Sequence, residues 1–356
     1  MRKVERIDPK SVDPLRLRDA LAIALGGGPA IALALAPLEH LHLPENVALI
    51  IETGGSTGKG KLVGLSAQAM QASARFSNQA LGAAKGDRWS LSLPLHHIAG
   101  INQLLRAIDL GSDPTPIGGQ FISIVPTQLY RALQSDDDTL EQLKSAKKVL
   151  MGGAAIPQQL LDQGRAAGVP LVTSYGMTEM CGGCVYDGIA LPGVSIRITP
   201  TGRIALKGPM RAEGYLGDDD ENAKAFVDDW FISNDEGNFD SHGILHIAGR
   251  IDDVIISGGE KISTTAVAEV LRTAFPLAEI HVLGVRDPHW GQALRVVMTR
   301  ASQSEISLEQ IRSLVAQSLG RIAAPRSLLL VSEVPVKSNG KVDLVTLAAA
   351  PATEEI

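Results

Sequence analysis

The chain has only two cysteines among its 356 residues, and aromatic residues make up only 4% of it. The cysteines, Cys181 and Cys184, are spaced C-x-x-C, and no pair of histidines with metal-binding spacing lies near them. A thioredoxin-like redox pair would need to stand where a helix begins after a strand. The spacing therefore favours reduced, packed thiols beside Thr178 and Glu179, where they could line a substrate pocket.

Long apolar runs and an excess of basic residues are also lacking. The longest apolar runs, such as 30–37 and 328–331, are far shorter than the roughly 20 residues of a membrane helix. The N-terminal segment 1–6, MRKVER, leads into Asp8 and Pro9 rather than into an apolar signal core. A net charge of −6 gives no general attraction for nucleic acid. We therefore expect a cytoplasmic protein that binds no nucleic acid and inserts into no membrane.

The length of the chain predicts one large and one small domain. Apolar strand-like runs alternate with helical patterns, which indicates an α/β protein. The clearest of these runs occupy 47–51, 122–125, 148–151 and 170–174. Short strand-like runs follow from about 190 to 250, and then come two helical patterns at 263–274 and 308–319. We predict a large α/β domain over residues 1–250 and a small α+β domain over 251–356.

The segment 53–61, TGGSTGKGK, reads as a strand running into a glycine-rich, basic loop. Its glycines let backbone N–H groups face an anion, and its hydroxyls and lysines add donors and charge. That chemistry suits a polyphosphate, although loops of this composition are often only surface turns. A Walker loop is disfavoured, because Thr53 stands five residues before Gly58 and Gly60 follows Lys59.

The loop resembles the phosphate loop T-[SG]-G-[ST]-T-G-x-x-K of the adenylate-forming superfamily, which includes acyl-CoA synthetases and peptide-synthetase adenylation domains. Four further motifs of that superfamily follow in its order. They are SYGMTE at 174–179, WFISNDEG at 230–237, GRIDDVIISGGEKI at 249–262 and PVKSNGKVD at 335–343. With five motifs in register, the chain is identified as a member. The resemblance implies an adenylate-forming enzyme fold with a mobile C-terminal domain and a hinge near Asp252.

The resemblance also implies two half-reactions, in which a carboxylate attacks ATP to give acyl-AMP and pyrophosphate, and the thiol of CoA then displaces AMP. ATP, Mg²⁺ and CoA are the implied cofactors and co-substrates. The catalytic residues by resemblance are Lys341, Thr178 and His97. The implied ATP and AMP ligands are Thr53, Ser56, Thr57, Lys61, Gly153, Ala154, Ala155, Ser174, Tyr175, Gly176, Met177, Thr178, Asp235, Arg250 and Lys341.

Individual roles follow from the motif positions. Glu179 would bind Mg²⁺, since a hard cation bridging phosphates prefers an oxygen ligand. Asp235 would accept hydrogen bonds from the ribose hydroxyls, and Gly258 and Gly259 would approach the CoA tunnel. Lys341 would neutralise the encounter between carboxylate and phosphate. For Glu179 and Lys341 the plainer alternative is a solvated surface side chain.

Two segments of the sequence indicate how the acid substrate is bound. PLHHIAG at 94–100 resembles P-L-x-H-x-x-G and makes His97 the expected neighbour of the acyl carboxylate, with Ser174 and Gly176 as further acid-binding residues. IVPTQLYRAL at 124–133 resembles the V-P-T-Q-L-x-R-L-L stretch of 2-succinylbenzoate–CoA ligases of menaquinone biosynthesis. Arg131 is therefore a candidate cation for a second substrate carboxylate, and an exposed helix residue is the alternative.

The region before the phosphate loop is shorter than in most relatives, because only residues 1–52 precede it. We expect a reduced N-terminal subdomain, as in compact actinobacterial 2-succinylbenzoate–CoA ligases. That subdomain often contributes to dimerisation, so a homodimer stays open. Another aryl or medium-chain acyl-CoA ligase, a carrier-loading adenylation enzyme and an inactive nucleotide-binding remnant are the alternatives. Intact Lys341, Glu179 and Asp235 count against the last.

Overall fold

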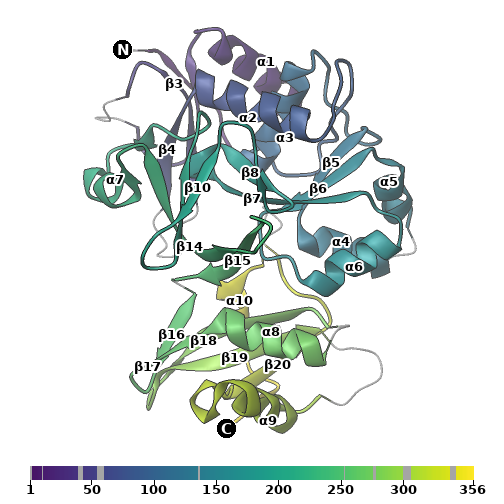
Figure 1. Cartoon of the computed structure of the whole chain (residues 1–356), viewed down its shortest axis with the longest axis vertical. Coiled ribbons are helices and arrows are strands. Elements are labelled where there is room, and N and C mark those ends of the chain that lie inside the picture. The colour runs from purple at the N-terminus through teal and green to yellow at the C-terminus, as the bar shows by residue number, and fades with distance from the viewer. Residues whose placement is uncertain are drawn as a thin grey trace. The chain divides into compact units, whose positions relative to one another are not determined.

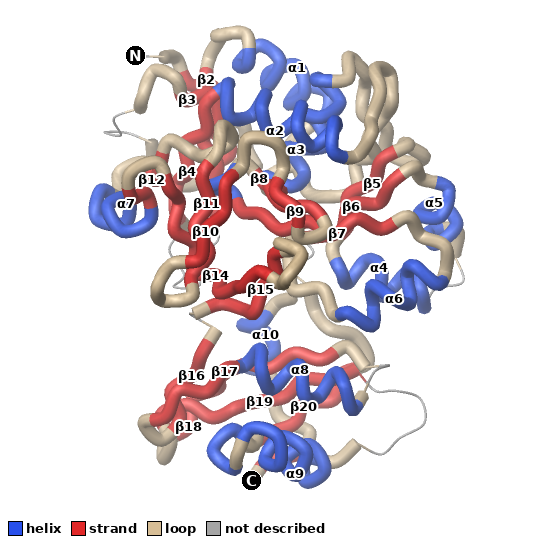
Figure 2. Tube along the Cα trace, viewed as in Figure 1, coloured by secondary structure: helices blue, strands red, loops and turns tan. Residues whose placement is uncertain are grey.

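The computed structural model describes residues 2–9, 11–38, 43–53, 60–134, 137–251, 253–275, 278–299, 306–336 and 342–356. The chain divides into two compact units, which we describe separately. The first unit comprises Met1–Ser233 and Gly237–Ile247, and the second comprises Asn234–Glu236 and Ala248–Ile356. Figure 2 shows helices and strands in both units.

A five-stranded sheet in the first unit has the order β1-β2-β3-β4-β12. Its strands are β1 (Val4–Arg6), β2 (Ala30–Leu33), β3 (Val47–Thr53), β4 (Lys61–Ser66) and β12 (Gly214–Tyr215). The first three strands are parallel, and β4 and β12 join in antiparallel pairs. Both β2 and the first part of β3 are fully buried, which explains their continuous apolar runs.

A second sheet in this unit has the order β5-β6-β7-β8-β9. Its strands are β5 (Phe121–Ile124), β6 (Lys148–Gly152), β7 (Leu171–Met177), β8 (Gly182–Tyr186) and β9 (Ile189–Ala190). The strands β5, β6 and β7 are parallel, so their carboxyl ends meet at one edge of the sheet. Ligands of α/β proteins bind at such edges.

A third sheet has the order β10-β11-β14-β13, and β15 pairs with β14. Its strands are β10 (Ser195–Ile198), β11 (Arg203–Lys207), β13 (Phe226–Val227), β14 (Trp230–Phe239) and β15 (Leu245–Arg250). These strands fall in the region from 190 to 250 where the sequence predicted short strands.

Helices cover the sheets of the first unit (Figure 1). They are α1 (Pro14–Leu25), α2 (Ala67–Ala80), α3 (Ile98–Asp109), α4 (Pro126–Gln134), α5 (Thr139–Ser145), α6 (Gln158–Ala166) and α7 (Asp219–Ala225), with the 3₁₀ turn η1 (Thr178–Met180). The helix α2 begins where Ser66 accepts a hydrogen bond from Ala69 N, and it contacts both β4 and β8. One apolar core therefore joins the first two sheets, with Trp89 and Phe121 fully buried in it.

The second unit carries a sheet of order β17-β16-β19-β20-β21, and β18 pairs with β19. Its strands are β16 (Val254–Ser257), β17 (Glu260–Ser263), β18 (Ile280–Asp287), β19 (Gly291–Thr299), β20 (Ser327–Val331) and β21 (Glu354–Glu355). Its helical elements are α8 (Thr264–Ala274), α9 (Leu308–Leu319), the 3₁₀ turn η2 (Arg321–Ala323) and α10 (Leu344–Ala349). Ser307 and Gln310 form a capping box at the start of α9.

The strands expected at 47–51, 122–125, 148–151 and 170–174 are confirmed as β3, β5, β6 and β7. The helices expected at 263–274 and 308–319 are confirmed as α8 and α9. Among the helices of the described ranges, none combines the length and the apolar character that crossing a membrane requires.

Candidate active site

The predicted adenine residues and two of the predicted acid-binding residues, Ser174 and Gly176, lie on β7 and directly after β6. Ser174 pairs with Gly152, the last residue of β6, and Gly153, Ala154 and Ala155 follow directly. A Cβ atom on Gly152 would lie 2.6 Å from the Ser174 carbonyl oxygen, so only glycine allows this approach. Ser174 and the turn 153–155 are therefore neighbours in the fold.

Two buried side chains form hydrogen bonds to the residue Cys181, at the end of the Thr178–Glu179 turn. The carbonyl oxygen of Cys181 accepts a hydrogen bond from Ser73 Oγ at 2.9 Å and another from Asn102 Nδ2 at 2.8 Å. Cys181 has φ +52°, the left-handed conformation that ends η1. The position of this turn therefore depends on α2 and α3, which carry Ser73 and Asn102.

Glu179 is fixed by Tyr215 on β12. The Tyr215 hydroxyl donates to Glu179 Oε1 at 2.7 Å, and the Glu179 carbonyl accepts from Ala212 N at 2.8 Å. Burial raises the pKa of Tyr215, and the neighbouring Glu179 carboxylate raises it further. The phenol therefore stays protonated and remains a donor to the carboxylate.

Lys61 lies over the Tyr215 ring. Its Nζ is 4.5 Å from the ring centroid and 2.6 Å from Glu221 Oε2. Hydrogen bonding by Lys61 is the largest influence that lowers the pKa of Glu221, to about 2. Thr53, which pairs with Lys61 across β3 and β4, donates its hydroxyl to the Lys61 carbonyl at 3.3 Å. Lys61 and Thr53 thus lie together, next to the residue that holds Glu179.

Residues 54–59 of the phosphate loop between these two strands lie outside the described residues, and the predicted ligands Ser56 and Thr57 are among them. The hinge residue Asp252 and the catalytic candidate Lys341 also lie outside them. In the second unit, Arg250 Nη1 donates to Asp235 Oδ1 at 3.3 Å. Asp235 is 9% exposed. Its carboxylate contacts Arg250, which the sequence also assigns to the nucleotide.

The predicted acid-binding residues lie on different elements. His97 precedes α3, and its ring centroid is 4.2 Å from that of His96. Arg131 lies exposed on α4 and lines a cavity of about 290 Å³ with apolar walls from Ile117, Ile122 and others. In the described chain this cavity includes neither His97 nor Ser174, because it borders β5 and β6 separates β5 from β7.

Gly258 and Gly259 form the turn between β16 and β17, with φ +59° and +90°. Gly258 N donates to the Trp290 carbonyl at 3.1 Å, and a Cβ atom on Gly258 would lie 2.7 Å from the Trp290 ring. The positive φ angles favour glycine at both positions, and at Gly258 the Trp290 ring also leaves no room for a side chain.

Both cysteines are free and fully buried. Burial raises the pKa of each thiol to about 12. The prediction of packed, reduced thiols is confirmed. The suggestion that they line a pocket is wrong, because neither side chain has any exposed surface.

Sequence reasoning missed Tyr215, Asn102 and Ser73. No local pattern marks them, since each acts across a contact between elements far apart in the chain. In the described part of the chain, no three His, Cys, Asp or Glu side chains gather into a metal cage. A magnesium ion held by one carboxylate and substrate phosphates needs no such cage.

Comparison with known proteins decides the family. Residues 117–223 match the AMP-binding enzyme model, and residues 266–341 match the AMP-binding enzyme C-terminal domain model. The chain is 34% identical over 364 aligned residues to a protein of Mycobacterium tuberculosis named probable 2-succinylbenzoate–CoA ligase, covering 93% of this chain and 94% of that one. This chain belongs to the AMP-binding, adenylate-forming enzymes.

Two further members of the AMP-binding enzymes bear on the fold. The 2-succinylbenzoate–CoA ligase of Bacillus licheniformis is 30% identical over 85% of this chain and 70% of its own. The structure of o-succinylbenzoate CoA synthetase from Bacillus subtilis, in complex with its acyl-adenylate intermediate, has a TM-score of 0.73 at 23% identity. It covers 99% of this chain and 84% of that one. The predicted adenylate-forming fold is confirmed.

Proposed function

We propose that this enzyme adenylates 2-succinylbenzoate with ATP and transfers the acyl group to CoA, giving 2-succinylbenzoyl-CoA, AMP and pyrophosphate for menaquinone biosynthesis. The observation that carries the proposal is the 34% identity to the mycobacterial protein of that name over nearly the whole of both chains. ATP and CoA are substrates of the cytoplasm, where we place the reaction.

The first half-reaction needs positive charge and donors around phosphate. We assign the β- and γ-phosphates to Thr53, Ser56, Thr57 and Lys61, and the α-phosphate to Thr178. Glu179 fits Mg²⁺, because its carboxylate is oriented by Tyr215 and keeps its second oxygen for a hard cation. When bound, the ion would neutralise phosphate charge. Lys61 must exchange its ion pair with Glu221 for phosphate oxygens.

The remaining predicted residues are assigned to the nucleoside and to the acid substrate. We assign adenine to Gly153, Ala154, Ala155, Tyr175 and Met177, the ribose to Asp235 and Arg250, and the acyl carboxylate to His97, Ser174 and Gly176. This assignment agrees with the meeting of Ser174 and the turn 153–155 at one sheet edge.

Arg131 remains our candidate for the second carboxylate of the acid. Its cavity has the character that such a ligand needs, a cation among mostly apolar walls. Asp137 also lines the cavity and would oppose an anion there. The Arg131→Ala variant should raise KM for 2-succinylbenzoate roughly tenfold to a hundredfold and leave KM for ATP unchanged. Equal KM values for the acid in both proteins would remove Arg131 from the site.

The second half-reaction uses different residues from the first. We propose that residues 1–250 bind ATP and acid, and that residues 251–356 form a small domain that moves about Asp252. Lys341 would serve the first half-reaction, and the turn at Gly258 and Gly259 would serve the second.

A substrate panel tests the proposal. Pyrophosphate release is measured with 2-succinylbenzoate, benzoate, hexanoate and amino acids, with and without CoA. We expect release with 2-succinylbenzoate and acyl-CoA formation only when CoA is present. Higher kcat/KM for benzoate or hexanoate would identify another acyl-CoA ligase, and release with amino acids alone would identify a carrier-loading enzyme.

A further inference from the structure

The second unit buries an arginine on β19, a central strand of its sheet. Arg295 is 6% exposed, and its hydrogen-bond acceptors in the described chain are all neutral. Its Nε donates to Ser327 Oγ on β20 at 3.1 Å. Burying a guanidinium costs free energy unless its donors are satisfied. The remaining acceptors of Arg295 therefore indicate why the charge stands there.

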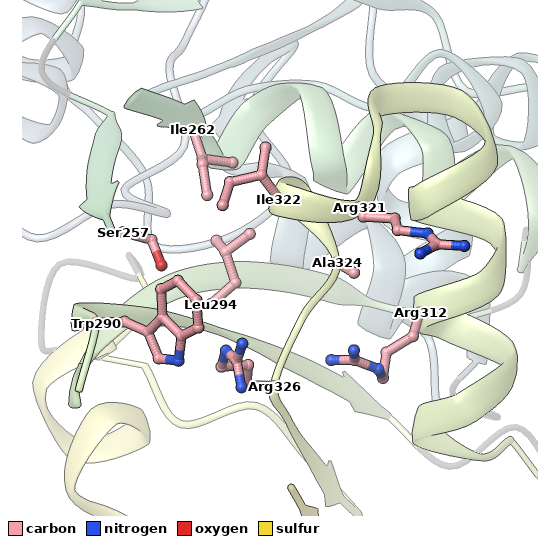
Figure 3. Close-up of a pocket in the computed structure, with 9 residues that line it drawn as sticks. All are labelled: Ser257, Ile262, Trp290, Leu294, Arg312, Arg321, Ile322, Ala324 and Arg326. Carbon is pink, nitrogen blue, oxygen red and sulfur yellow. The ribbon is translucent and has the colours of Figure 1, made fainter. Parts of the chain in front are cut away.

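A cavity of about 220 Å³ lies on the other face of this sheet (Figure 3). It is lined by three further arginines, Arg312, Arg321 and Arg326, and by Leu294, the neighbour of Arg295 on β19. Successive side chains of a strand point to opposite faces. Leu294 accordingly packs with residues of α8 and α9, whereas Val297 packs with Leu347 of α10. Arg295 shares the face of Val297, so the sheet separates it from the cavity and directs it to α10.

The other acceptors of Arg295 are backbone carbonyls at the end of α10. Its Nη1 donates to the carbonyl oxygens of Leu347 at 3.2 Å, Ala348 at 3.1 Å and Ala350 at 2.6 Å. The last carbonyls of a helix have no partners within the helix. A helix of six residues is also too short to be stable alone. Arg295 therefore satisfies the end of α10 and fastens this short helix to the sheet.

The helix α10 follows directly after the motif that contains Lys341. Its N-cap is Asp343, two positions after Lys341 in the sequence. Asp343 N donates to the Pro335 carbonyl at 2.9 Å, and Val336 and Val342 form an antiparallel bridge. These contacts join the two described ends of the motif. Lys341 lies outside the described residues and directly precedes the second of these ends.

We propose that Arg295 is a positioning residue for adenylation, because it holds α10 and thereby fixes Val342 and Asp343, the residues that follow Lys341. The inference rests on the proposed function, in which Lys341 serves the first half-reaction. Misplacing a reacting group by about 1 Å can slow a reaction roughly a hundredfold. Arg295 is buried, so it acts through α10 rather than on a substrate.

The two half-reactions distinguish this role from a general contribution to folding. The second half-reaction is assigned to the turn at Gly258 and Gly259, which belongs to the same unit as Arg295. Loss of the fold of this unit would therefore slow both half-reactions. A misplaced Lys341 would slow only the formation of acyl-AMP.

The kinetic test uses Arg295→Lys. The variant keeps the charge, but a single ammonium nitrogen cannot span Ser327 and the α10 carbonyls together. We expect kcat for acyl-AMP formation, measured as pyrophosphate release with 2-succinylbenzoate, to fall roughly tenfold to a hundredfold. KM for ATP should stay unchanged, and supplied acyl-AMP and CoA should be converted at a near-normal rate.

Two further variants accompany this measurement. Ser327→Ala removes the acceptor that orients Nε of Arg295 and should give the same pattern with a smaller loss. Arg272→Lys is the matched control, because it replaces an arginine of α8 that donates to the Ile280 carbonyl at 3.3 Å, away from α10. It should change neither half-reaction by much. Equal losses of both half-reactions in Arg295→Lys and Ser327→Ala, or no loss in either, would overturn the proposal.

A double-mutant cycle separates this inference from the proposed function. In the Lys341→Ala background, Arg295→Lys should not lower the residual rate of acyl-AMP formation further, because the side chain that it positions is gone. An equal fold-loss in both backgrounds refutes the positioning role. Lys341→Ala alone tests the role assigned to Lys341, and pyrophosphate release by the native protein tests the ligase proposal, whatever the result for Arg295.

Discussion

Tyr215 donates its hydroxyl hydrogen to the Glu179 carboxylate over 2.7 Å, although 36 positions separate the two residues in sequence. The bond ties β12 of the first sheet to the turn that follows β7 of the second. It leaves one carboxylate oxygen of Glu179 for another ligand. The geometry at Glu179 therefore depends on a side chain that takes no direct part in the proposed chemistry.

Replacing Tyr215 with phenylalanine tests this dependence. Tyr215→Phe keeps the ring that contacts Lys61 and removes the donor. We expect kcat/KM for ATP to fall roughly tenfold to a hundredfold, as for a hydrogen bond to a charged group, with a higher Mg²⁺ requirement. Pyrophosphate release measured over a range of Mg²⁺ concentrations gives both values.

Tyr186→Phe is the matched control, because it removes a buried phenol that contacts Ser77 and Arg106 instead. It should lower the free energy of unfolding and leave the Mg²⁺ requirement unchanged. If both variants shifted the Mg²⁺ requirement alike, Tyr215 would act only through the fold.

The sequence predicted the elements of this site better than their connections. The strands β3 and β6 could be predicted because their buried apolar residues stand in unbroken runs. The motifs located Glu179 and Lys61. Tyr215 could not be predicted, because β12 has two residues and is a strand only through its pairing with β4. A two-residue strand has no periodicity to detect.

Contacts between buried polar groups also could not be predicted from the sequence. Asn102 lies in α3 among apolar residues, and its role follows from Cys181, 79 positions away. Local patterns specify periodicity and capping, whereas these contacts arise from tertiary packing.

The ion pair between Lys61 and Glu221 gives a second prediction. Lys61→Gln should lower kcat/KM for ATP roughly tenfold to a hundredfold, because a phosphate loses a charged donor. Conversion of supplied acyl-AMP and CoA to acyl-CoA should stay close to normal. Rates of the two half-reactions, measured separately, check this expectation. If both fell together, the lysine would support the fold rather than bind phosphate.

Glu221→Gln is the complementary variant. It removes the competing carboxylate 2.6 Å from Lys61 Nζ and keeps the shape of the side chain. We expect KM for ATP to stay equal or decrease, since Lys61 no longer exchanges one anion for another. An increase in KM would mean that Glu221 orients the lysine for ATP.

Asn102 provides a third prediction, about the turn that carries Thr178 and Glu179. Asn102→Leu removes the donor to the Cys181 carbonyl and leaves Ser73 as the remaining side-chain donor. We expect a loss of about 1–3 kcal/mol in the free energy of unfolding, measured with urea, and slower adenylation. Ser73→Ala removes the other donor and should act in the same direction. Unchanged adenylation in both variants would show that the turn keeps its position without them.

The buried thiols predict how stability depends on pH. In the unfolded chain a thiol loses its proton near pH 8.5, whereas Cys181 and Cys184 keep theirs up to about 12. Between these values the folded state binds more protons, so stability falls as pH rises, by about 1.4 kcal/mol per pH unit for each thiol. Urea unfolding from pH 8 to 10.5 should show a shallower decline in the Cys181→Ala/Cys184→Ala variant. Parallel declines would mean that the thiols titrate equally in both states.

The last prediction concerns Lys341 and Asp252, and it tests whether one chain performs two chemistries by moving a domain. Lys341 should act only while ATP is attacked, when charge builds between carboxylate and phosphate. Lys341→Ala should therefore lose acyl-AMP formation, by several kcal/mol of transition-state stabilisation, and still convert supplied acyl-AMP and CoA at a near-normal rate. Asp252→Pro should do the reverse, because a fixed φ and a lost N–H hinder rotation at the pivot. Asp253→Ala, one position along the chain, is the control and should change neither half-reaction by much. Equal loss of both half-reactions in Lys341→Ala, or no loss in Asp252→Pro, would contradict the alternation of domains.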